Sequence, residues 1–503
     1  MSSLSPLLDS TTVGVSFVIA VTGLVAISKW KGSQSLPYPP GPPPDPIIGN
    51  ARAMGSDELE RVFAAWGKKY GDVNYVTVVG QPIIVLNSYQ AARDLLEKRS
   101  GIYSSRPRMV MLSELMGWGD VLSHQRVGPR FRKHRGIIQE QFSAKQISQY
   151  MHIQRKEAYA TLADLGNTPD DLMKHLKRVL HNGALTAAGT ILNVTYGYTV
   201  KDCNDPLVTL ADECTSATIA GGGPGSLLCD LVPALKYWPT WAPFSGFKKH
   251  AVYTRSLVER FFDEPYQWIK THMVEGTAKQ CITVDLMETM RTQSGPYRAS
   301  ETIDTTDVLH IGSVLYAGES TDLSTFLQTS AILKAFVLAL LLHPGVFSKV
   351  REEIDQKTGK ERLVDFDDRD SLPYFECVMK EVIRWGCPIP LGMPHQLTEN
   401  DTYQGYSMPK DATVMFNAWF VLYPEPEQFM PERFWGKMDT EVARQVNAVF
   451  GFGRRVCPGK AFAESNIFLI MSNIIATMDL TKAVDEAGVP ITPPVEYTKS
   501  FIK

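Results

Sequence analysis

A single cysteine near the C-terminal end stands among residues whose types and spacing could do chemistry. The stretch from Phe450 to Gly459 reads FGFGRRVCPG and places Cys457 directly before an apolar run of helical character. Gly453 and Gly459 have no side chain, so the backbone there can approach a flat, bulky group or adopt a positive φ. Backbone N–H groups at the start of the following helix would stabilise a thiolate. Arg455 could pair with an anionic part of the same bulky group.

Three roles are open to Cys457. A thiolate, backbone clearance and a nearby cation together fit a haem held by an axial sulfur. A nucleophilic thiol would need a histidine partner, and nothing in the neighbouring sequence suggests one. A buried structural thiol is the commonest fate of a single cysteine, but it would leave the glycines and arginines unexplained. The residues therefore favour a ligand.

The stretch FGFGRRVCPG also matches Phe-x-x-Gly-x-Arg-x-Cys-x-Gly at every fixed position. This is the haem-binding signature of the cytochrome P-450 monooxygenases, which the chain resembles over nearly its whole length. The resemblance implies that Cys457 is the proximal ligand of the iron in haem b and that Arg455 pairs with a haem propionate. Phe450, Gly453 and Gly459 take the other signature positions. Within the family the chain is similar to fungal secondary-metabolism members, such as the O-methylsterigmatocystin oxidoreductase group.

A set of charged residues lies upstream of the cysteine in the order typical of the family. Glu381 and Arg384 form a Glu-x-x-Arg pair, and residues at i and i+3 share a helix face on which they can form an ion pair. The stretch PERF at 431–434 supplies Arg433. The resemblance implies a buried network of Glu381, Arg384 and Arg433 that supports the proximal side of the haem and takes no part in the chemistry.

Two stretches depart from the family pattern, and the first is an early helix. Family members carry Trp-x-x-x-Arg there, whereas this chain reads RFRKHRG, with Phe131 and Arg135 at the two positions. The resemblance implies that Arg135 contacts a haem propionate. The missing indole N–H removes one hydrogen-bond donor. Arg132, Lys133 or His134 could replace that donor, although most charges on a helix face water.

The second departure lies in the long distal helix. Family members carry an acid followed by an alcohol there, and these groups help to deliver protons to bound dioxygen. This chain reads YAGESTD at 316–322. Matching the Ala-Gly pair places Thr321 at the alcohol and Ser320 at the acid, whereas a shift by one places Glu319 and Ser320 at the two positions. Thr321, Glu319 and Ser320 are therefore the candidate catalytic residues.

The spacing to the following His343-Pro344 gives a different register for this motif. Counting back from that dipeptide leads to Gln328-Thr329, about two helical turns further along the chain. We favour the register at 317–321, because Tyr-Ala-Gly precedes it as in family members. The alternative is that none of these polar residues relays protons and that ordered water does so.

The bulk composition excludes several classes of protein. The chain has 503 residues, of which 44% are hydrophobic, and a formal net charge of −3. This charge gives no indication of a nucleic-acid partner, which would require a basic surface. The seven cysteines form no close Cys-x-x-Cys pair. A disulfide framework or a zinc cluster is therefore not expected.

The N-terminal region has the composition of a membrane anchor. Residues 10–28 are uncharged and mostly apolar, and nineteen residues approach the roughly 30 Å of a bilayer core. Basic residues follow this run, which places the rest of the chain in the cytosol. We predict an anchor over 1–30, a proline-rich hinge over 31–48 and a catalytic domain over 49–503, held at the endoplasmic reticulum membrane by one span. A cleaved signal peptide is the alternative.

The remaining sequence predicts an α+β fold that is mostly helical, with a small β-region segregated at one end. Residues 73–88 read as a hairpin that turns at Gly80-Gln81-Pro82, and another strand is expected within 413–422. Helices are expected at 130–141, 253–274, 303–342, 344–355, 374–386 and 459–478.

Apolar stretches predict the substrate contacts and a second membrane contact. The segments 109–118 and 389–393, with Val308, Ile311 and Leu315 of the distal helix, are rich in Met, Leu and Ile and suit an apolar substrate. His395, close to the second segment, is expected to be structural. Residues 229–249 combine tryptophans and phenylalanines with lysines, as at a membrane interface. An ordinary core loop is the alternative for that stretch.

The resemblance implies a monooxygenase that uses haem b, molecular oxygen and electrons from NADPH. The electrons would come from a separate membrane-bound reductase that approaches the Cys457 side of the molecule. The substrate would be an apolar small molecule of terpenoid or other secondary-metabolite type. The departure in the distal motif leaves open a thiolate-haem isomerase that needs no reductase. A haem-binding protein without enzymatic activity is a further alternative.

Overall fold

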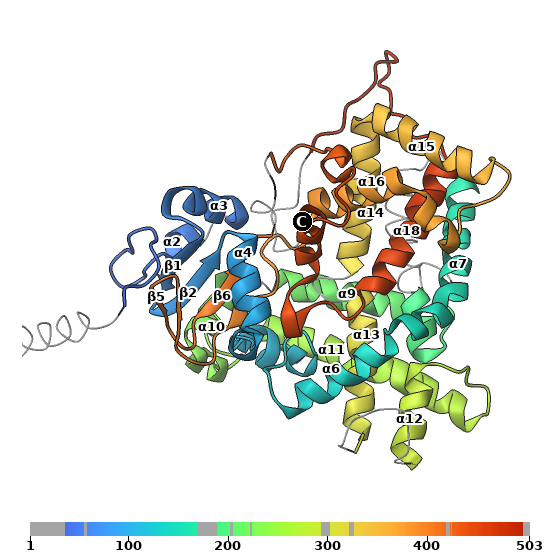
Figure 1. Cartoon of the computed structure of the whole chain (residues 1–503). Helices are drawn as coiled ribbons and strands as arrows, with labels where there is room; N and C mark the ends of the chain where they lie inside the picture. The colour runs from blue at the N-terminus through green and yellow to red at the C-terminus, as the bar shows by residue number, and fades with distance from the viewer. Residues whose placement is uncertain are drawn as a thin grey trace, which may run out of the picture.

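The computed structural model describes residues 36–54, 58–167, 189–201, 205–221, 224–292, 302–320, 326–418, 423 and 425–495. Figure 1 shows a small β-region at one side and a larger helical body beside it. The predicted α+β architecture with a segregated β-region is confirmed for these residues.

The β-region consists of two sheets. The larger has the order β1-β2-β6-β3, and the smaller pairs β4 with β5. The bounds are β1 Val73–Val78, β2 Gln81–Leu86, β3 His395–Gln396, β4 Asp401–Tyr403, β5 Tyr406–Met408 and β6 Thr413–Phe416. The predicted hairpin is confirmed: β1 and β2 are antiparallel, with Val78 opposite Gln81. The pairing of β2 with β6 is parallel and joins segments far apart in the sequence.

Helices make up most of the described chain. The longer ones are α3 Leu59–Tyr70, α6 Pro129–Gln141, α7 Ala144–Asn167, α9 Pro206–Ala220, α10 Pro224–Leu231, α11 Gly246–Val274, α12 Ile282–Thr292, α13 Thr305–Ser320, α14 Phe326–Leu342, α15 Pro344–Thr358, α16 Pro373–Gly386 and α18 Lys460–Thr477. The shorter ones include α2 Ala51–Met54, α4 Tyr89–Ala92, α5 Ser100–Tyr103, α17 Glu441–Gln445, the π-helical turns η1 Arg93–Lys98 and η2 Val110–Leu115, and the 3₁₀ turns η3 Trp118–Asp120, η5 Pro233–Tyr237, η6 Phe366–Ser371, η7 Pro431–Phe434, η8 Val446–Phe450 and η9 Gly453–Arg455. The single helix expected over 303–342 corresponds to α13 and α14, and residues 321–325 lie outside the described chain.

The largest core cluster lies where α14, α16 and α18 pack against one another and against the sheet. Phe336 of α14, Phe375 of α16 and Phe468 of α18 are all fully buried in it. The two phenylalanines of α16 and α18 meet edge to face, with ring centroids 5.4 Å apart. Such aromatic pairs stabilise a core beyond their buried area. The helix that follows Cys457 is therefore held rigidly from several sides.

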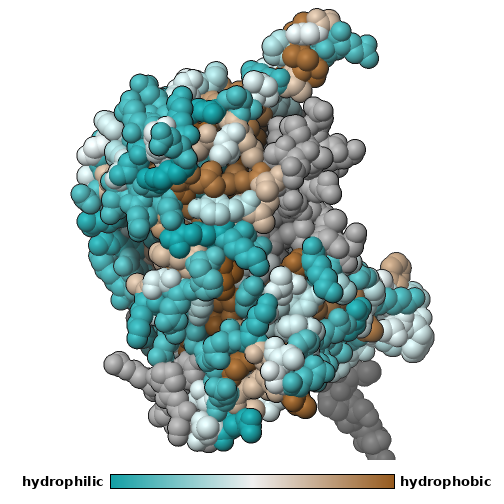
Figure 2. Space-filling view, turned by 90° about the vertical axis from the view of Figure 1, so that its right-hand side faces the viewer, coloured by the Kyte–Doolittle hydropathy of each residue, from teal (hydrophilic) through white to brown (hydrophobic). Residues whose placement is uncertain are grey.

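The face shown in Figure 2 is mainly hydrophilic, with hydrophobic residues visible in its hollows. Within the described chain no single helix is long and apolar enough to cross a bilayer. One sharply bent pair, 331–342 with 344–358, passes the same test of length and hydropathy. The predicted anchor at 10–28 lies outside the described residues.

The described part of the proline-rich stretch, residues 36–48, packs on the β-region. Tyr38 stacks on Tyr75 of β1 with ring centroids 4.4 Å apart. The N–H of Ser407 donates to the carbonyl of Pro37 at 2.8 Å. A Cβ at Gly41 would lie 2.1 Å from the carbonyl oxygen of Tyr75, so only glycine permits this close approach. The division into anchor, hinge and catalytic domain stays a prediction.

Candidate active site

The loop that carries Cys457 is shaped by close backbone contacts. The N–H of Cys457 donates to the carbonyl of Phe450 at 2.7 Å, which closes the loop on itself. Gly453 has φ +53°, and a Cβ there would lie 2.5 Å from the carbonyl oxygen of Leu96. A glycine is therefore required at position 453 by the packing of the protein itself. A Cβ at Gly459 would meet no described atom within 4 Å, because Gly459 borders open space.

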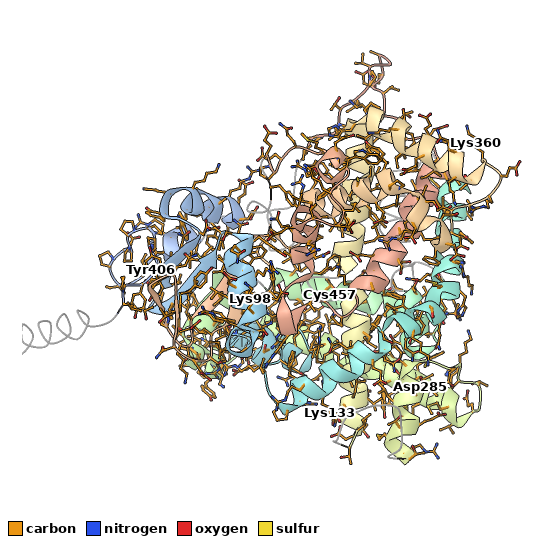
Figure 3. All side chains as sticks on the ribbon, viewed as in Figure 1. Lys98, Lys133, Asp285, Lys360, Tyr406 and Cys457 are labelled. Atoms are coloured by element: carbon orange, nitrogen blue, oxygen red, sulfur yellow. The ribbon has the colours of Figure 1, made fainter. Side chains whose placement is uncertain are left out.

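That space is a cavity of about 240 Å³ that opens to solvent. Cys457 lies on its wall near the centre of the molecule (Figure 3). The lining is mainly apolar and includes Val121, Leu122, Ile138, Val314, Leu315, Ile332, Ile389, Leu391, Phe416, Phe450, Phe452 and Phe462. Among the described lining residues none is acidic, whereas three are arginines: Arg106, Arg135 and Arg455.

Arg455 is held in place almost entirely by backbone carbonyls. Its guanidinium donates to the carbonyl oxygens of Ser104 at 2.7 Å, Leu122 at 2.9 Å and Gln125 at 2.5 Å. The guanidinium carbon lies 3.9 Å from the ring centroid of Phe131, so the residue that departs from the family's tryptophan forms a cation–π contact. Burial, followed by the charges of Arg106 and Arg135, lowers the pKa of Arg455. A guanidinium keeps its proton in proteins, so the lowered pKa reflects the cost of burying this charge, to which the two neighbouring arginines add.

Arg106 and Arg135 are the other two arginines that line the cavity. Arg106 donates to the carbonyls of Ser123 at 2.7 Å, Met393 at 2.8 Å and Pro394 at 2.7 Å. Arg135 is buried, and its Nε has no hydrogen-bond partner within the described chain. Burial lowers the pKa of Arg135, and Cys457 partly offsets this effect. Two buried cations and one partly buried cation, with no carboxylate among the described lining residues, are costly unless an anion joins them.

His395 also lines the cavity, on β3. Its Nδ1 lies 2.8 Å from the carbonyl oxygen of Tyr103, so Nδ1 carries the proton and donates. Burial, followed by the charge of Arg106, lowers the pKa of His395 to about 3. A structural role was predicted for His395, whereas Arg106 was not among the predicted site residues. Arg106 stands in SSRPR, far from the cysteine in sequence, and no local pattern marks it.

The residues fit a haem. The cavity offers apolar walls for a flat macrocycle, a sulfur at its wall and an open approach at Gly459. The three arginines, one with an orphaned Nε, suit the two carboxylates that a haem carries. The structure brings Cys457, Arg455, Arg135 and Phe450 to this cavity. Gly453 instead packs against η1, and Gly459 borders the cavity directly.

Glu381, Arg384 and Arg433 lie together as a buried network apart from the cavity. Glu381 accepts from Arg384 Nε at 2.7 Å and Nη2 at 2.8 Å, and from Arg433 Nε at 3.0 Å. The N–H of Met430 donates to the same carboxylate at 2.7 Å. The side chains of Glu381 and Arg384 are 0% and 1% exposed. The network ties α16 to η7, as the family pattern implies for a structural role.

The candidate distal residues lie at or beyond the C-terminal end of α13, where the described part of the chain stops at residue 320. Glu319 and Ser320 are the last residues of α13, and their side chains lie outside the described part. Thr321 lies outside the described residues altogether. Thr329, in the other register, belongs to α14, and its side chain is likewise outside the description. The choice of register stays a prediction.

The predicted substrate contacts divide into two groups. Leu315 of α13 and the segment 389–393 line the cavity, which agrees with their predicted role. No described residue of 109–118 is among the lining residues. Met111 and Trp118 are instead buried in a core cluster with Phe261 of α11. Val308 and Ile311 of α13 are likewise buried in a core cluster and do not line the cavity. An apolar composition suits a core as well as a pocket, so the sequence could not separate the two.

Comparison with known proteins decides the family. The cytochrome P450 family model matches residues 39–495. This chain belongs to the cytochrome P450 family. It is a cytochrome P450 monooxygenase, similar to cytochrome P450 monooxygenase 176 of Postia placenta, with 34% identity over 482 residues that cover 94% of this chain and 89% of the relative.

Other fungal relatives are similar over comparable lengths. Cytochrome P450 monooxygenase COX2 of Coprinopsis cinerea is 36% identical over 480 residues, covering 94% of this chain and 88% of the relative. Cytochrome P450 monooxygenase ARMGADRAFT_974139 of Armillaria gallica is 36% identical over 477 residues, covering 93% and 90%. This P450 is therefore similar to fungal P450 monooxygenases over nearly its whole length.

Proposed function

We propose that this P450 is a haem-thiolate monooxygenase that oxidises an apolar small molecule, of terpenoid or other secondary-metabolite type, in a fungal pathway. The observation that carries the proposal is the cavity that unites Cys457 with Arg106, Arg135 and Arg455 and that is otherwise mainly apolar. The cations suit a dianionic cofactor, and the apolar walls suit a substrate that binds by burial.

Each residue has a distinct role toward the haem. Cys457 would hold the iron through its sulfur, and the bent loop from Phe450 fixes the position of that sulfur. Arg135 and Arg455 would pair with the haem carboxylates, with Arg106 adding positive charge beside them. When bound, the haem supplies the activation of molecular oxygen from which one oxygen atom enters the substrate.

The substrate would lie against side chains that offer few polar contacts. Val121, Leu122, Val314, Leu315 and the segment 389–393 line this part of the cavity. Such walls orient a substrate by shape and exclude water. We assign proton delivery to the alcohol of Thr321, with Glu319 and Ser320 beside it.

The proposed electron donor is a membrane-bound reductase that uses NADPH. On the cysteine side, a second hollow is lined by Arg93, Arg444 and Lys460 together with Glu97 and Glu441. Its excess of positive charge suits an acidic partner surface.

A membrane contact is proposed through two regions, the anchor at 10–28 and the segment 229–249. In that segment Trp241 and Phe244 are 83% and 94% exposed, close to Lys236 and Lys248. Exposed aromatic rings beside lysines suit the interfacial layer of a bilayer. We place the protein at the endoplasmic reticulum membrane with its catalytic domain in the cytosol.

The spectrum of the reduced, carbon monoxide-treated protein tests the haem assignment. We expect the band of thiolate ligation in the wild type and its loss in Cys457→His, with Cys387→Ser, at a buried cysteine elsewhere, as the control. A wild-type band of imidazole type would overturn the assignment. Adding the NADPH reductase and an apolar substrate should then give oxygen uptake with an oxygenated product. Turnover without the reductase would instead identify an isomerase.

A further inference from the structure

A buried polar cluster lies outside the cavity, where α6 passes the first turns of α13. Figure 3 shows Lys133 at this crossing, at the lower edge of the molecule. The side chains of His134, Asp307 and Lys133 are 0%, 5% and 9% exposed. None of these three is among the residues that line the cavity. Charged groups are rarely buried this deeply without a role for the arrangement that they fix.

Asp307 is the centre of the cluster. Its Oδ1 lies 2.9 Å from Nε2 of His134, and its Oδ2 forms an ion pair with Lys133. Oδ2 also accepts from the N–H of Asp304 at 3.0 Å, while the carboxylate of Asp304 accepts from the N–H of Asp307 at 2.8 Å. This reciprocal pair caps the start of α13. Burial raises the pKa of Asp307, but the bonds from Lys133, Asp304 and His134 outweigh it and lower the pKa to about 2.

His134 joins Asp307 to the loop before α6. Its Nδ1 lies 3.1 Å from Nε2 of Gln125, and that same Nε2 donates to the carbonyl of Asp120 at 2.6 Å. A carbonyl can only accept, so this atom of Gln125 is the amide nitrogen. Nδ1 of His134 must then accept a hydrogen bond from Gln125. Nε2 must carry the proton, which it donates in the hydrogen bond to Asp307. The imidazole is therefore neutral and fixed in one tautomer.

The path continues from Gln125 to the cavity. The carbonyl oxygen of Gln125 accepts from Nη2 of Arg455 at 2.5 Å. Arg135 follows His134 directly on α6 and lines the same cavity. One chain of contacts thus runs from the start of α13, through Asp307, His134 and Gln125, to Arg455. The rotation of α6 about its axis, which His134 fixes, also sets where Arg135 lies.

We propose that His134 and Asp307 are positioning residues that hold Arg455 and Arg135 in place toward the haem carboxylates. The inference rests on the proposed function, because it assumes a haem in the cavity. By this proposal His134 and Asp307, which lie outside the cavity, influence how tightly the haem is bound. A cluster that merely stabilised the fold would lower stability without changing the haem environment.

The test compares variants of the haem-loaded protein. His134→Leu removes both bonds of the imidazole, whereas His134→Gln retains an amide that can donate to Asp307 and accept from Gln125. Lys133→Met is the matched control, because it breaks a contact to the same carboxylate but lies off the path to Arg455. The rate of haem transfer to excess apomyoglobin, the reduction potential of the iron and the urea midpoint are measured for each.

We expect His134→Leu to release haem about tenfold faster, which corresponds to the loss of one hydrogen bond to a charged group. His134→Gln should restore the rate to within about threefold of the wild type. Lys133→Met should lower the urea midpoint but leave the haem-transfer rate within about twofold. Equal changes in haem transfer for His134→Leu and Lys133→Met, or none for either, would overturn the proposal.

A second variant covers the case in which His134→Leu does not accumulate as a folded protein. Gln125→Leu breaks the path on the other side of the imidazole and leaves the contact between His134 and Asp307 intact. It should also speed haem transfer, and an unchanged rate would count against the proposal. The wild-type carbon monoxide spectrum separates the two hypotheses. Without a thiolate band the proposed function fails, whereas a normal band with unchanged transfer rates rejects only the positioning role.

Discussion

Two groups of buried arginines differ in one respect, the presence of a carboxylate. Arg384 and Arg433 share Glu381, whose oxygens accept four hydrogen bonds from the two guanidinium groups and the Met430 N–H. Arg106 and Arg455 donate instead to backbone carbonyls, and Arg135 has an orphaned Nε within the described chain. The first group, here called the complete network, contains its own carboxylate. The second, here called the incomplete group, has no carboxylate among the described residues that line the cavity.

This difference separates a structural network from a binding site. A buried ion pair whose partners come from the same chain contributes to the fold from the moment of folding. A cluster of cations without a carboxylate destabilises the folded chain until an anion binds. Part of the binding free energy of that anion is then used to offset the repulsion between the cations. The contrast therefore predicts opposite effects of removing charge from the two groups.

The largest effect is expected at the complete network. Glu381→Gln removes the carboxylate and leaves Arg384 buried without its counter-charge. Such a change costs about 3–5 kcal/mol of unfolding free energy. Urea unfolding and the yield of soluble, haem-loaded protein measure it. A loss below about 1 kcal/mol would show that this network is not structural.

The incomplete group should respond in the opposite direction. Arg135→Met removes a buried cation, so the haem-free protein should be as stable as the wild type or more stable. Haem affinity should fall by roughly 1.5–3 kcal/mol, the size of a hydrogen bond to a charged group. Haem titration and urea unfolding of the haem-free protein measure the two quantities. Arg132→Met, at an exposed position of the same helix, is the control. A variant that loses stability without haem would contradict the comparison.

Burial, together with the charge of Arg106, makes stability depend on pH at His395. Its pKa is lowered to about 3 in the fold, so the unfolded chain binds the proton more readily. Stability is unaffected above pH 6.5 and is lost as pH falls from 6.5 toward 3, by roughly 2 kcal/mol at pH 5. The difference between the haem-free wild type and His395→Gln should grow over this range. A difference that stays flat over this range would refute the effect.

The smallest effect is expected at an exposed pair next to the complete network. Arg61 and Glu427 are 2.6 Å apart, with side chains 47% and 63% exposed. Glu427→Gln should cost less than about 1 kcal/mol of unfolding free energy, because water screens both charges. The backbone carbonyl of residue 427, which accepts from the indole N–H of Trp385, is unchanged in this variant. A loss as large as that of Glu381→Gln would mean that burial does not distinguish the two pairs.

The sequence predicted the parts of the site that are local. The loop around Cys457 and the Glu381–Arg384 pair are each encoded within ten residues. The β1–β2 hairpin also forms as predicted, but its turn lies at residues 79–80, and Pro82 pairs with Thr77 inside the ladder. The contacts of Arg106 and the link from Asp307 to Gln125 depend on which loops meet in the fold. The apolar segment 109–118 was assigned to the pocket but is packed in the core. Periodicity marks a buried face without saying what covers it.

The contacts of Arg455 also bear on how this protein acquires its cofactor in the cell. Its partner Ser104 precedes it by 351 residues, and Arg106 reaches a carbonyl 287 residues further along. Contacts of such long range form late, because distant parts of the chain must first come together. On the ribosome, the loop with Cys457 is synthesised long after Ser104 and Arg106. Haem capture is therefore expected only once these distant segments have come together, which makes cofactor supply a step in the maturation of the protein.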